Sequence, residues 1–391
     1  MKNTILLFFI FYPSQLLFSQ VIKGRVVNDI DKPIANVNIY LDGTKTGTVS
    51  AADGSFVLDI PPKINNSVVF KKDDYESFTA NSSDVVNKNL KVILIKAKEI
   101  EEVVIVPFTE TAYKNYIHYF LNNFIGEDKT NVKIKNQRSL KFSFDKQNKI
   151  LRVKAPQTLI IENKNLGYKI DYNLEEFVAD FENQTTSYIG TSFFSETKST
   201  DKVKLNRMNA YDGSAIHFLR SVYSKKTKDE GFIVHQMKRF PNPKYPTQQE
   251  LLKLEDFAKI QRANSKIAII IPDDIQDIMT RKNKESKYGI ANIQPNLTEA
   301  DYTKNYEDRL FLEFKDIIEV RHDKYFYELK GKEFVKSKFP VKQITHVHSN
   351  DEIFEIYSNG NNSNPTNLLY QGDFTKNKIE FLLPLDYQLG D

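Results

Sequence analysis

The sequence contains no cysteine and no tryptophan, and only 14 of its 391 residues are glycine. Without cysteine the chain forms no disulfide, supplies no thiolate to a metal and has no acceptor for a lipid anchor. An excess of one charge is also absent, since 55 Lys and Arg stand against 51 Asp and Glu, mixed along the chain. This balance excludes the strongly basic surface typical of nucleic-acid-binding proteins.

Long apolar runs are also scarce, and the N-terminal one is too short to cross a membrane. Lys2 precedes the apolar run 5–12, which residues 13–15 (Pro-Ser-Gln) interrupt, and a membrane-spanning helix needs about 20 apolar residues. The pattern predicts a signal peptide over 1–19, cleaved after Ser19; the alternative is an uncleaved anchor. A disulfide-free exported protein of this size fits the periplasm or cell surface of a bacterium, and the lack of cysteine excludes a lipoprotein.

Aromatic and β-branched residues are abundant, with 28 Phe and 20 Tyr, and this favours strands. Residues 21–95 contain several short alternating runs separated by turn signals, including the hairpin signal Asp53-Gly54. Two runs show the alternation clearly: Val37, Ile39 and Leu41 in the first, and Phe56, Leu58 and Ile60 in the second. This part of the chain therefore predicts a small β-sandwich.

The glycine-containing segment 43–48 (Gly-Thr-Lys-Thr-Gly-Thr) has three interpretations: a phosphate loop, a calcium loop or a corner of the sandwich. A phosphate loop needs Gly-x4-Gly-Lys-Ser/Thr at the start of a helix, whereas Thr48-Val49 follows Gly47 here. A calcium loop needs alternating carboxylates, and only Asp42 and Asp53 are near. The segment is therefore predicted to be a corner of the sandwich.

The spacing of these residues is similar to that of a known family. The matching motifs are Gly24-x-Val26, Pro33-Ile34-x-Asn36-Val37-x-Ile39, Gly43-Thr44-x-x-Gly47-Thr48 and Asp53-Gly54-x-Phe56-x-Leu58. Together they resemble the carboxypeptidase regulatory-like domain over residues 21–96, although Ser50-Ala51 departs from the family's usual Thr-Asp. The resemblance implies a transthyretin-like β-sandwich of the kind common in envelope proteins of diderm bacteria. It implies no carboxypeptidase activity, because this domain accompanies catalytic domains and has no catalytic residues itself.

The chain divides into a signal peptide (1–19), the sandwich (20–97), a β-strand linker (98–108) and a larger module (109–391). In transporters with the same leading domain, a segment resembling Glu102-Val103-Val104 is the strand that contacts TonB. Fewer than three hundred residues follow this segment, too few for a plug and a barrel of about 22 strands. The linker interpretation is therefore favoured.

The larger module is predicted to be a β-rich α+β domain with about three helices. The first helix, 109–125, has Thr109 as N-cap; the second spans roughly 205–227, and the third follows Pro246. Strands are expected between and after the helices, including the segments LGYKIDYNLEEFVADF, SKIAIIIP and DRLFLEFK. The segments LGYKIDYNLEEF, GSAIHFLRSVYSKKTKDEGFIV and LLPLDY resemble an uncharacterised module of exported proteins, which implies a companion architecture and no reaction.

The six histidines show no His-Glu-x-x-His spacing, the zinc motif of many metalloproteases. His346 and His348 are weak metal candidates, because residues two apart on a strand face the same side. Asp351 is near, but no third ligand is evident, and a solvated strand face is the favoured interpretation. The sequence therefore predicts no metal and no cofactor.

Other motifs also have simpler interpretations. Ser195-x-x-Lys198 matches a nucleophile pattern of penicillin-binding proteins, but the companion Ser-Asp-Asn and Lys-Thr-Gly motifs are missing. Gly213-Ser214 with His217 indicates a helix cap more than a catalytic dyad. The carboxylates of Asp273, Asp274 and Asp277 could act as acid and base, but a helix start explains them as well. The aromatic side chains of Tyr116, Tyr119 and Phe120 could stack on a sugar, but packing in the core is the favoured interpretation.

The sequence thus predicts a non-enzymatic exported envelope protein. Its sandwich is the accessory or docking module, its C-terminal region is the specific binding surface, and its partner is an unknown envelope protein or glycan. One alternative is a hydrolase whose site is assembled from distant residues. Another is a partner of TonB-linked transport that uses strand 101–106 for strand addition.

The N-terminal pattern makes a direct prediction about the mature protein. We expect the chain recovered from a bacterial envelope fraction to begin near Gln20, because signal peptidase cleaves after small residues such as Ser19. N-terminal sequencing tests this, and an intact Met1 or purely cytoplasmic recovery would contradict it.

Overall fold

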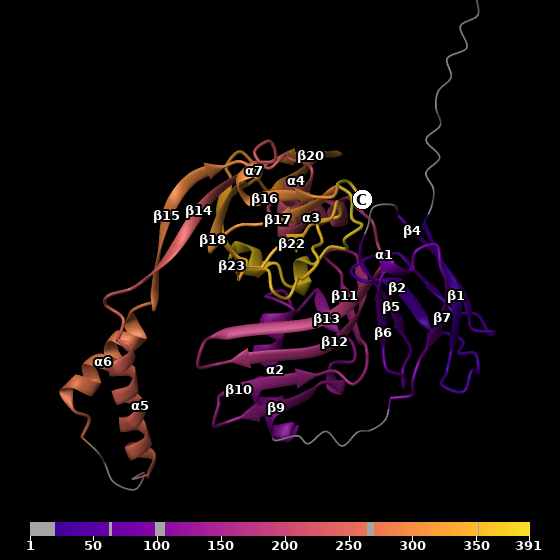
Figure 1. Ribbon diagram of the computed structural model, residues 1–391. Helices are drawn as coiled ribbons and strands as arrows, with labels where there is room; N and C mark the ends of the chain where they lie inside the picture. Colours follow the sequence, from indigo (N-terminus) through magenta and orange to yellow (C-terminus); the bar gives the residue numbers. More distant parts are fainter. Residues whose placement is uncertain (1–19, 62–64, 98–105, 264–269, 351) are drawn as a thin grey trace, which may run out of the picture. The chain divides into compact units, whose positions relative to one another are not determined.

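The computed structural model describes residues 20–61, 65–97, 106–263, 270–350 and 352–391 (Figure 1). The predicted signal peptide and most of the predicted linker, including Glu102-Val103-Val104, lie outside this range. The chain forms two compact units: residues up to 203 with 384–389 and 391, and residues 204–383 with 390. Among the described residues, no helix combines the length and apolar character needed to cross a membrane.

The N-terminal part of the first unit is a β-sandwich, as predicted. One sheet has the order β4-β1-β7 and the other the order β3-β2-β5-β6. The elements are β1 (Gln20–Val27), β2 (Asn38–Leu41), β3 (Gly47–Val49), β4 (Ser55–Ile60), β5 (Ser67–Lys71), β6 (Phe78–Asn81), the short helix α1 (Ser82–Val85) and β7 (Asn89–Ile93). The alternating side chains of β2 and β4 meet in one core, which confirms the predicted faces.

Tyr40 lies on the other face of β2, away from the sandwich core, but it is only 3% exposed. Phe193, from a second sheet, covers it with a ring-centroid distance of 5.3 Å. The outer face of the sandwich is thus covered at Tyr40.

The rest of the first unit is a second sheet with a helix against it. It contains α2 (Glu110–Phe124), β8 (Val132–Ile134), β9 (Lys141–Asp145), β10 (Ile150–Lys154), β11 (Leu159–Asn163), β12 (Tyr168–Asp180) and β13 (Thr185–Glu196). The strand order is β8-β11-β12-β10-β9, and β13 pairs along the whole of β12. Strands β12 and β13 form a long hairpin, visible in Figure 1.

Helix α2 begins and packs as the sequence predicts. The Thr109 hydroxyl accepts the Ala112 N–H at 3.1 Å. The apolar face of the helix, formed by Tyr113, Ile117, Phe120 and Phe124, is buried. Phe120 packs against the ring of Phe177 at 4.9 Å, in the core. Tyr116 and Tyr119 contact other aromatic rings of the same unit but are only partly buried, so Phe120 alone of this group belongs to the core.

The segment 43–48 joins the sandwich to the second sheet. The Gly43 N–H donates to the Ser192 carbonyl oxygen at 2.8 Å, and the Phe194 N–H donates to the Thr44 carbonyl oxygen at 2.9 Å. Gly43 has φ +70°, and at Gly47 a Cβ would lie 2.7 Å from the Phe193 ring. Both glycines are therefore required, one by its backbone conformation and the other by the close approach of the second sheet.

The second unit is built on a five-stranded sheet of order β15-β14-β18-β21-β23, with a three-stranded sheet (β16-β17-β22) and a hairpin (β19-β20). Its elements are α3 (Asp201–Tyr211), α4 (Ala215–Tyr223), β14 (Phe232–Pro241), α5 (Gln248–Ala263), α6 (Asp273–Lys284), β15 (Tyr288–Leu297), α7 (Glu299–Tyr302), β16 (Thr303–Tyr306), β17 (Arg309–Leu312), β18 (Ile317–Lys324), β19 (Tyr327–Lys330), β20 (Glu333–Lys336), β21 (Val341–His348), β22 (Phe354–Glu355) and β23 (Leu369–Gly372). Helices α5 and α6 lie at the far end of the β14–β15 ribbon (Figure 1).

The larger module has more helices than the sequence predicted: six in its described part, α2 to α7, where about three were expected. The predicted helix over 205–227 is two helices, because the chain turns at residues 212–214. Gly213 has φ +66° there, and the Ser214 hydroxyl accepts the His217 N–H to begin α4. Helix α5 begins as predicted, with the Thr247 N–H donating to the Glu250 carboxylate at 2.7 Å.

The strand predicted over SKIAIIIP is not present in its described part. Residues 270–272 have no strand structure, Ile270 is 91% exposed, and residues 264–269 lie outside the described range. Apolar character alone predicted this strand, and a short apolar run does not fix secondary structure.

The joint between the sandwich and the second sheet contains a partly buried carboxylate, Asp42. Burial raises its pKa from 3.8 to about 6, although the N–H groups of Ser192 and Gly43 lower it. The folded state therefore binds this proton more tightly than the unfolded chain, and stability falls as pH rises from 3.8 to about 6.

We predict that Asp42→Asn removes this loss of stability at higher pH, because the amide is neutral and keeps an oxygen that accepts the Ser192 N–H. Above pH 6 the first unit of the variant should be more stable than wild type by about 2 kcal/mol, or a few degrees in Tm. The two proteins should converge near pH 4. Differential scanning calorimetry across this pH range measures the difference.

Asp53→Asn is the matched control, and its expected effect on stability at neutral pH has the opposite sign. Hydrogen bonds from the Ser55 hydroxyl and N–H lower the pKa of Asp53, so its stabilisation is present at neutral pH and lost on acidification. The control should be less stable than wild type at pH 7 and equal to it at low pH. A Tm difference for Asp42→Asn that is independent of pH would contradict the proposed role of Asp42.

Candidate functional site: a groove beside strand β12

The candidate site lies where β12 changes partners. Strand β12 pairs with β11 over residues 168–172 and with β10 over 177–180, and the chain from β10 to β11 leaves the sheet between them. Glu175 is the extra residue of a β-bulge on β12, because Leu174 pairs with Gly190 and Glu176 with Ile189. Bulges redirect side chains and are common beside functional sites. This bulge leaves the Glu175 side chain exposed at the groove.

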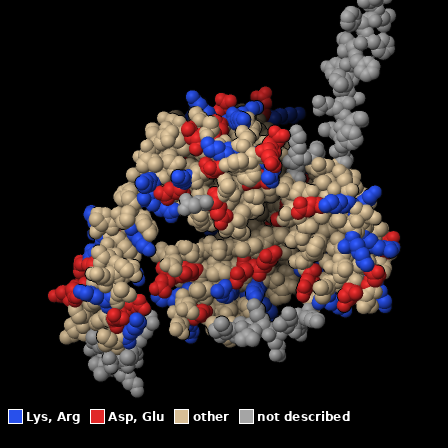
Figure 2. All heavy atoms as spheres, in the orientation of Figure 1, with Lys and Arg blue, Asp and Glu red and all other residues tan. Residues whose placement is uncertain are grey.

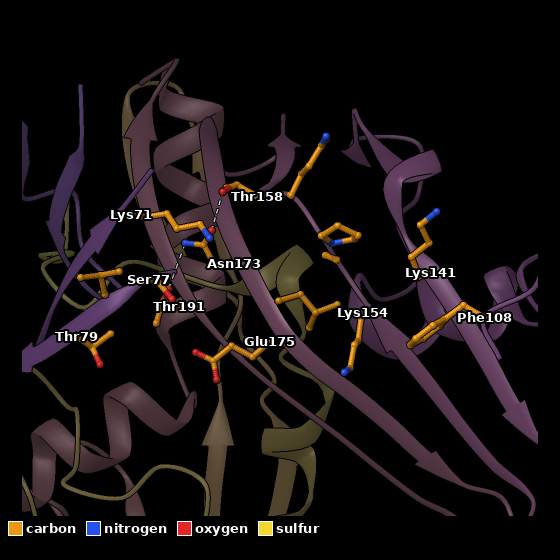
Figure 3. A pocket seen from close by; sticks show the side chains of 15 residues that line it. Lys71, Ser77, Thr79, Phe108, Lys141, Lys154, Thr158, Asn173, Glu175 and Thr191 are labelled. Atoms are coloured by element: carbon orange, nitrogen blue, oxygen red, sulfur yellow. Dashed lines mark hydrogen bonds between the residues drawn. The ribbon is translucent and has the colours of Figure 1, made fainter. Parts of the chain in front are cut away.

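Two adjoining hollows of about 340 and 270 Å³ lie beside this part of β12. They share four lining residues: Lys71, Gln157, Thr158 and Asn173. We call the two hollows together the groove. Strands β5 and β6 of the sandwich line it on one side, and β9, β10, β12 and β13 of the second sheet on the other (Figure 3).

A fixed hydrogen-bond network centred on Asn173 forms the floor of the groove. The Thr158 hydroxyl donates to Asn173 Oδ1 at 2.6 Å, and Asn173 Nδ2 donates to Thr191 Oγ1 at 3.3 Å (Figure 3). Asn173 Nδ2 also donates to the Tyr40 hydroxyl at 2.6 Å. The Tyr40 and Thr191 hydroxyls are 3.1 Å apart and also hydrogen-bonded. The network holds one orientation of the amide and joins the sandwich to both strands of the hairpin.

Burial keeps the phenols of this region protonated at neutral pH. It raises the pKa of Tyr40 to about 12, with a smaller contribution from the charge of Asp42, and it raises the pKa of Tyr188 to about 12. Both hydroxyls therefore remain neutral, and Tyr40 keeps its place in the Asn173 network.

The two hollows differ in charge. Lys71, Lys141 and Lys154 line the larger one together with Glu175, as Figure 3 shows. Two carboxylates, Asp73 and Asp171, line the smaller one, with Asp171 paired to Lys169 at 3.0 Å, and Lys71 lies at the boundary. The groove therefore runs from a mainly positive to a mainly negative region. The outer surface in Figure 2 instead shows both charges interspersed.

The metal candidates of the sequence lie in the second unit, on β21. His346 Nε2 is 3.0 Å from Glu319 Oε2, and the Glu319 side chain is only 8% exposed. Burial lowers the pKa of His348. Asp351 lies outside the described residues. His346 and His348 thus lie on the same side of β21, as predicted, and His346 contacts the buried carboxylate of Glu319 on β18.

The remaining motif residues lie apart from the groove network. Ser195 is on β13, opposite Lys169, and Lys198 is exposed beyond the strand end. The three aspartates after the predicted strand belong to α6, where Asp273 and Asp274 occupy the first turn and Asp277 pairs with Arg281 at 2.8 Å. These findings agree with the helix-start interpretation of the aspartates.

Sequence reasoning missed the groove residues Asn173 and Glu175, although one signal was present. The alternation through Tyr172 and Leu174 changes phase at the consecutive pair Glu175-Glu176 before Phe177. Such a change within a long strand indicates a bulge. The partners of Asn173 on the sandwich could not be predicted, because they are far away in the sequence.

The family comparison agrees with the sandwich. Residues 22–105 match the family model of the CarboxypepD_reg-like domain, so the N-terminal part of the chain is a CarboxypepD_reg-like domain. The match does not extend into the second sheet or the second unit. No curated protein matches the chain.

Proposed function

We propose that the protein is a binding protein of the bacterial cell envelope, and that its groove binds a short peptide segment with both an acidic and a basic group. The observation that supports this most is the change of charge along the groove, from Lys71, Lys141 and Lys154 to Asp73 and Asp171. A ligand with charges of both signs matches this arrangement in one direction only.

The floor of the groove suits the backbone of a peptide. Peptide groups present both donors and acceptors, and the groove offers hydroxyl, amide and carboxylate groups beside the apolar side chains of Val69, Phe108 and Leu174. The larger hollow is within the range of about 300–1,000 Å³ that is usual for ligand sites. The network around Asn173 holds these groups in place before the ligand arrives, which reduces the entropy cost of binding.

A binding role also fits the chemistry of the groove better than a hydrolase. Nucleophilic catalysis requires a nucleophile held beside a base. The groove hydroxyls of Thr158 and Thr191 instead contact the amide of Asn173, and Glu175 is exposed. A role in TonB-linked transport depends on residues 101–106, of which only Val106 is described.

The proposal predicts that Lys71→Glu weakens binding of a mixed-charge peptide by about tenfold or more, because the variant places a carboxylate where the ligand's acidic group lies. The probe is a fluorescein-labelled tetrapeptide library with Asp or Glu at one end and Lys at the other. Fluorescence anisotropy with the full chain gives Kd for each library member.

Lys23→Glu is the matched control, since Lys23 is an exposed lysine on β1 with the same charge change outside the groove. It should leave Kd unchanged. Equal weakening by both variants would show a non-specific effect of net charge. Competition by uncharged oligosaccharides and not by unlabelled peptides would show that the ligand is a glycan, and would contradict the proposal.

A further inference from the structure

The second unit contains a buried cluster that the proposed function does not use. Asp212 lies in the turn between α3 and α4, His217 is in the first turn of α4, and His322 is on β18. Each offers one ligand atom, and the three atoms lie within 4.8 Å of one another. The residues are only 8%, 6% and 4% exposed.

Two of the three distances between the ligand atoms are close to those of a tetrahedral metal site, and the third pair, His217 Nδ1 and His322 Nε2, lies within 4.8 Å. Asp212 Oδ1 lies 3.3 Å from His322 Nε2 and 3.7 Å from His217 Nδ1. Zinc binds nitrogen and oxygen at about 2.0–2.1 Å, which places the ligands of a tetrahedron about 3.3 Å apart. A small contraction around the ion is therefore enough to bring the three atoms into coordination.

The other ring nitrogens have the partners that metal-binding histidines usually have. His322 Nδ1 is 3.2 Å from the Gly231 carbonyl oxygen, and His217 Nε2 is 3.3 Å from the Glu230 carboxylate. A proton on each of these nitrogens leaves a lone pair on His322 Nε2 and one on His217 Nδ1. The latter accepts the Gly213 N–H at 3.1 Å, a hydrogen bond that a metal ion at His217 would replace. Outer carbonyl and carboxylate partners of this kind fix the tautomer of metal-binding histidines.

Two buried polar atoms of the site, His322 Nε2 and Gln343 Oε1, have no hydrogen-bond partner among the described residues. Gln343 pairs with His322 across β21 and β18, and its Oε1 lies 2.1 Å from the position that a Cβ on Gly213 would take. An unpartnered buried acceptor is costly, and a lone pair facing a carboxylate is repelled by it. A cation among these atoms removes both penalties.

The alternative to a metal ion is a proton on His322, because the protonated imidazole would form an ion pair with Asp212. The charges that face the cluster are those of Glu230, on the side of His217, and of Lys324, two residues after His322 on β18. An ion pair satisfies His322 but leaves Gln343 Oε1 without a partner. A metal ion that binds His322 Nε2 and Gln343 Oε1 provides for both groups.

We propose that Asp212, His217 and His322 bind a structural zinc-class divalent ion, with Gln343 Oε1 as a fourth donor. The ion ties the turn between α3 and α4 to β18 and β21, in the centre of the second unit. The site is closed to solvent, as structural zinc sites are, whereas catalytic sites keep an open position. This proposal replaces the expectation that the chain needs no metal.

The test uses the full chain, stripped with a chelator and titrated with Co²⁺, whose visible absorption reports tetrahedral coordination, followed by competition with Zn²⁺. We expect one ion per chain, the absorption bands of a tetrahedral site with nitrogen and oxygen ligands, and a higher Tm of the second unit. Asp212→Asn and His322→Gln should each weaken binding more than about 100-fold, because loss of even an outer partner costs about 10- to 100-fold.

The matched control is the double variant His346→Gln and His348→Gln, which removes the two histidines that the sequence suggested. It should keep one ion per chain. Should Asp212→Asn or His322→Gln fail to fold, the wild-type titration decides the matter. Wild-type protein without stoichiometric binding, or with a Tm that zinc and chelator leave unchanged, would show that the cluster holds a proton only. Loss of the ion in the His346/His348 variant would also overturn the proposal.

Discussion

The main-chain hydrogen bonds between segment 43–44 and β13 are the constraint on which the first unit depends. They extend the sandwich into the second sheet, since the Gly43 N–H and the Thr44 carbonyl oxygen bond to Ser192 and Phe194. The same approach covers Tyr40 with Phe193 and buries the Asp42 carboxylate. A segment that resembles a ligand loop in the sequence is thus a structural joint in the CarboxypepD_reg-like domain.

The groove follows from this joint and from the division of β12 between two partners. The joint places β5 and β6 beside the second sheet, and the bulge at Glu175 leaves a part of β12 that neither β10 nor β11 covers. The Asn173 amide links the two sides through Tyr40 and Thr191. Residues of both the sandwich and the hairpin therefore line the groove.

Local patterns predicted the local structure well. Alternation gave the buried faces of β2 and β4, and capping residues gave the starts of α2 and α5. The motif Gly213-Ser214 with His217 predicted the cap that begins α4, although the helix predicted over 205–227 ran through it. Both candidate sites were missed for a physical reason: Tyr40 and Asn173, like Asp212 and His322, meet only through tertiary contacts, and periodicity contains no information about such contacts.

Residue-resolved amide hydrogen exchange tests the central claim, that the sandwich and the second sheet are joined through the 43–44 segment. The amides of Gly43, Ser192 and Phe194 each donate a hydrogen bond across the joint. The account predicts that all three exchange as slowly as the amides of the β12–β13 ladder, because opening them requires separation of the two sheets. Exchange of these three amides at the rate of an exposed loop, while the ladder stays protected, would contradict it.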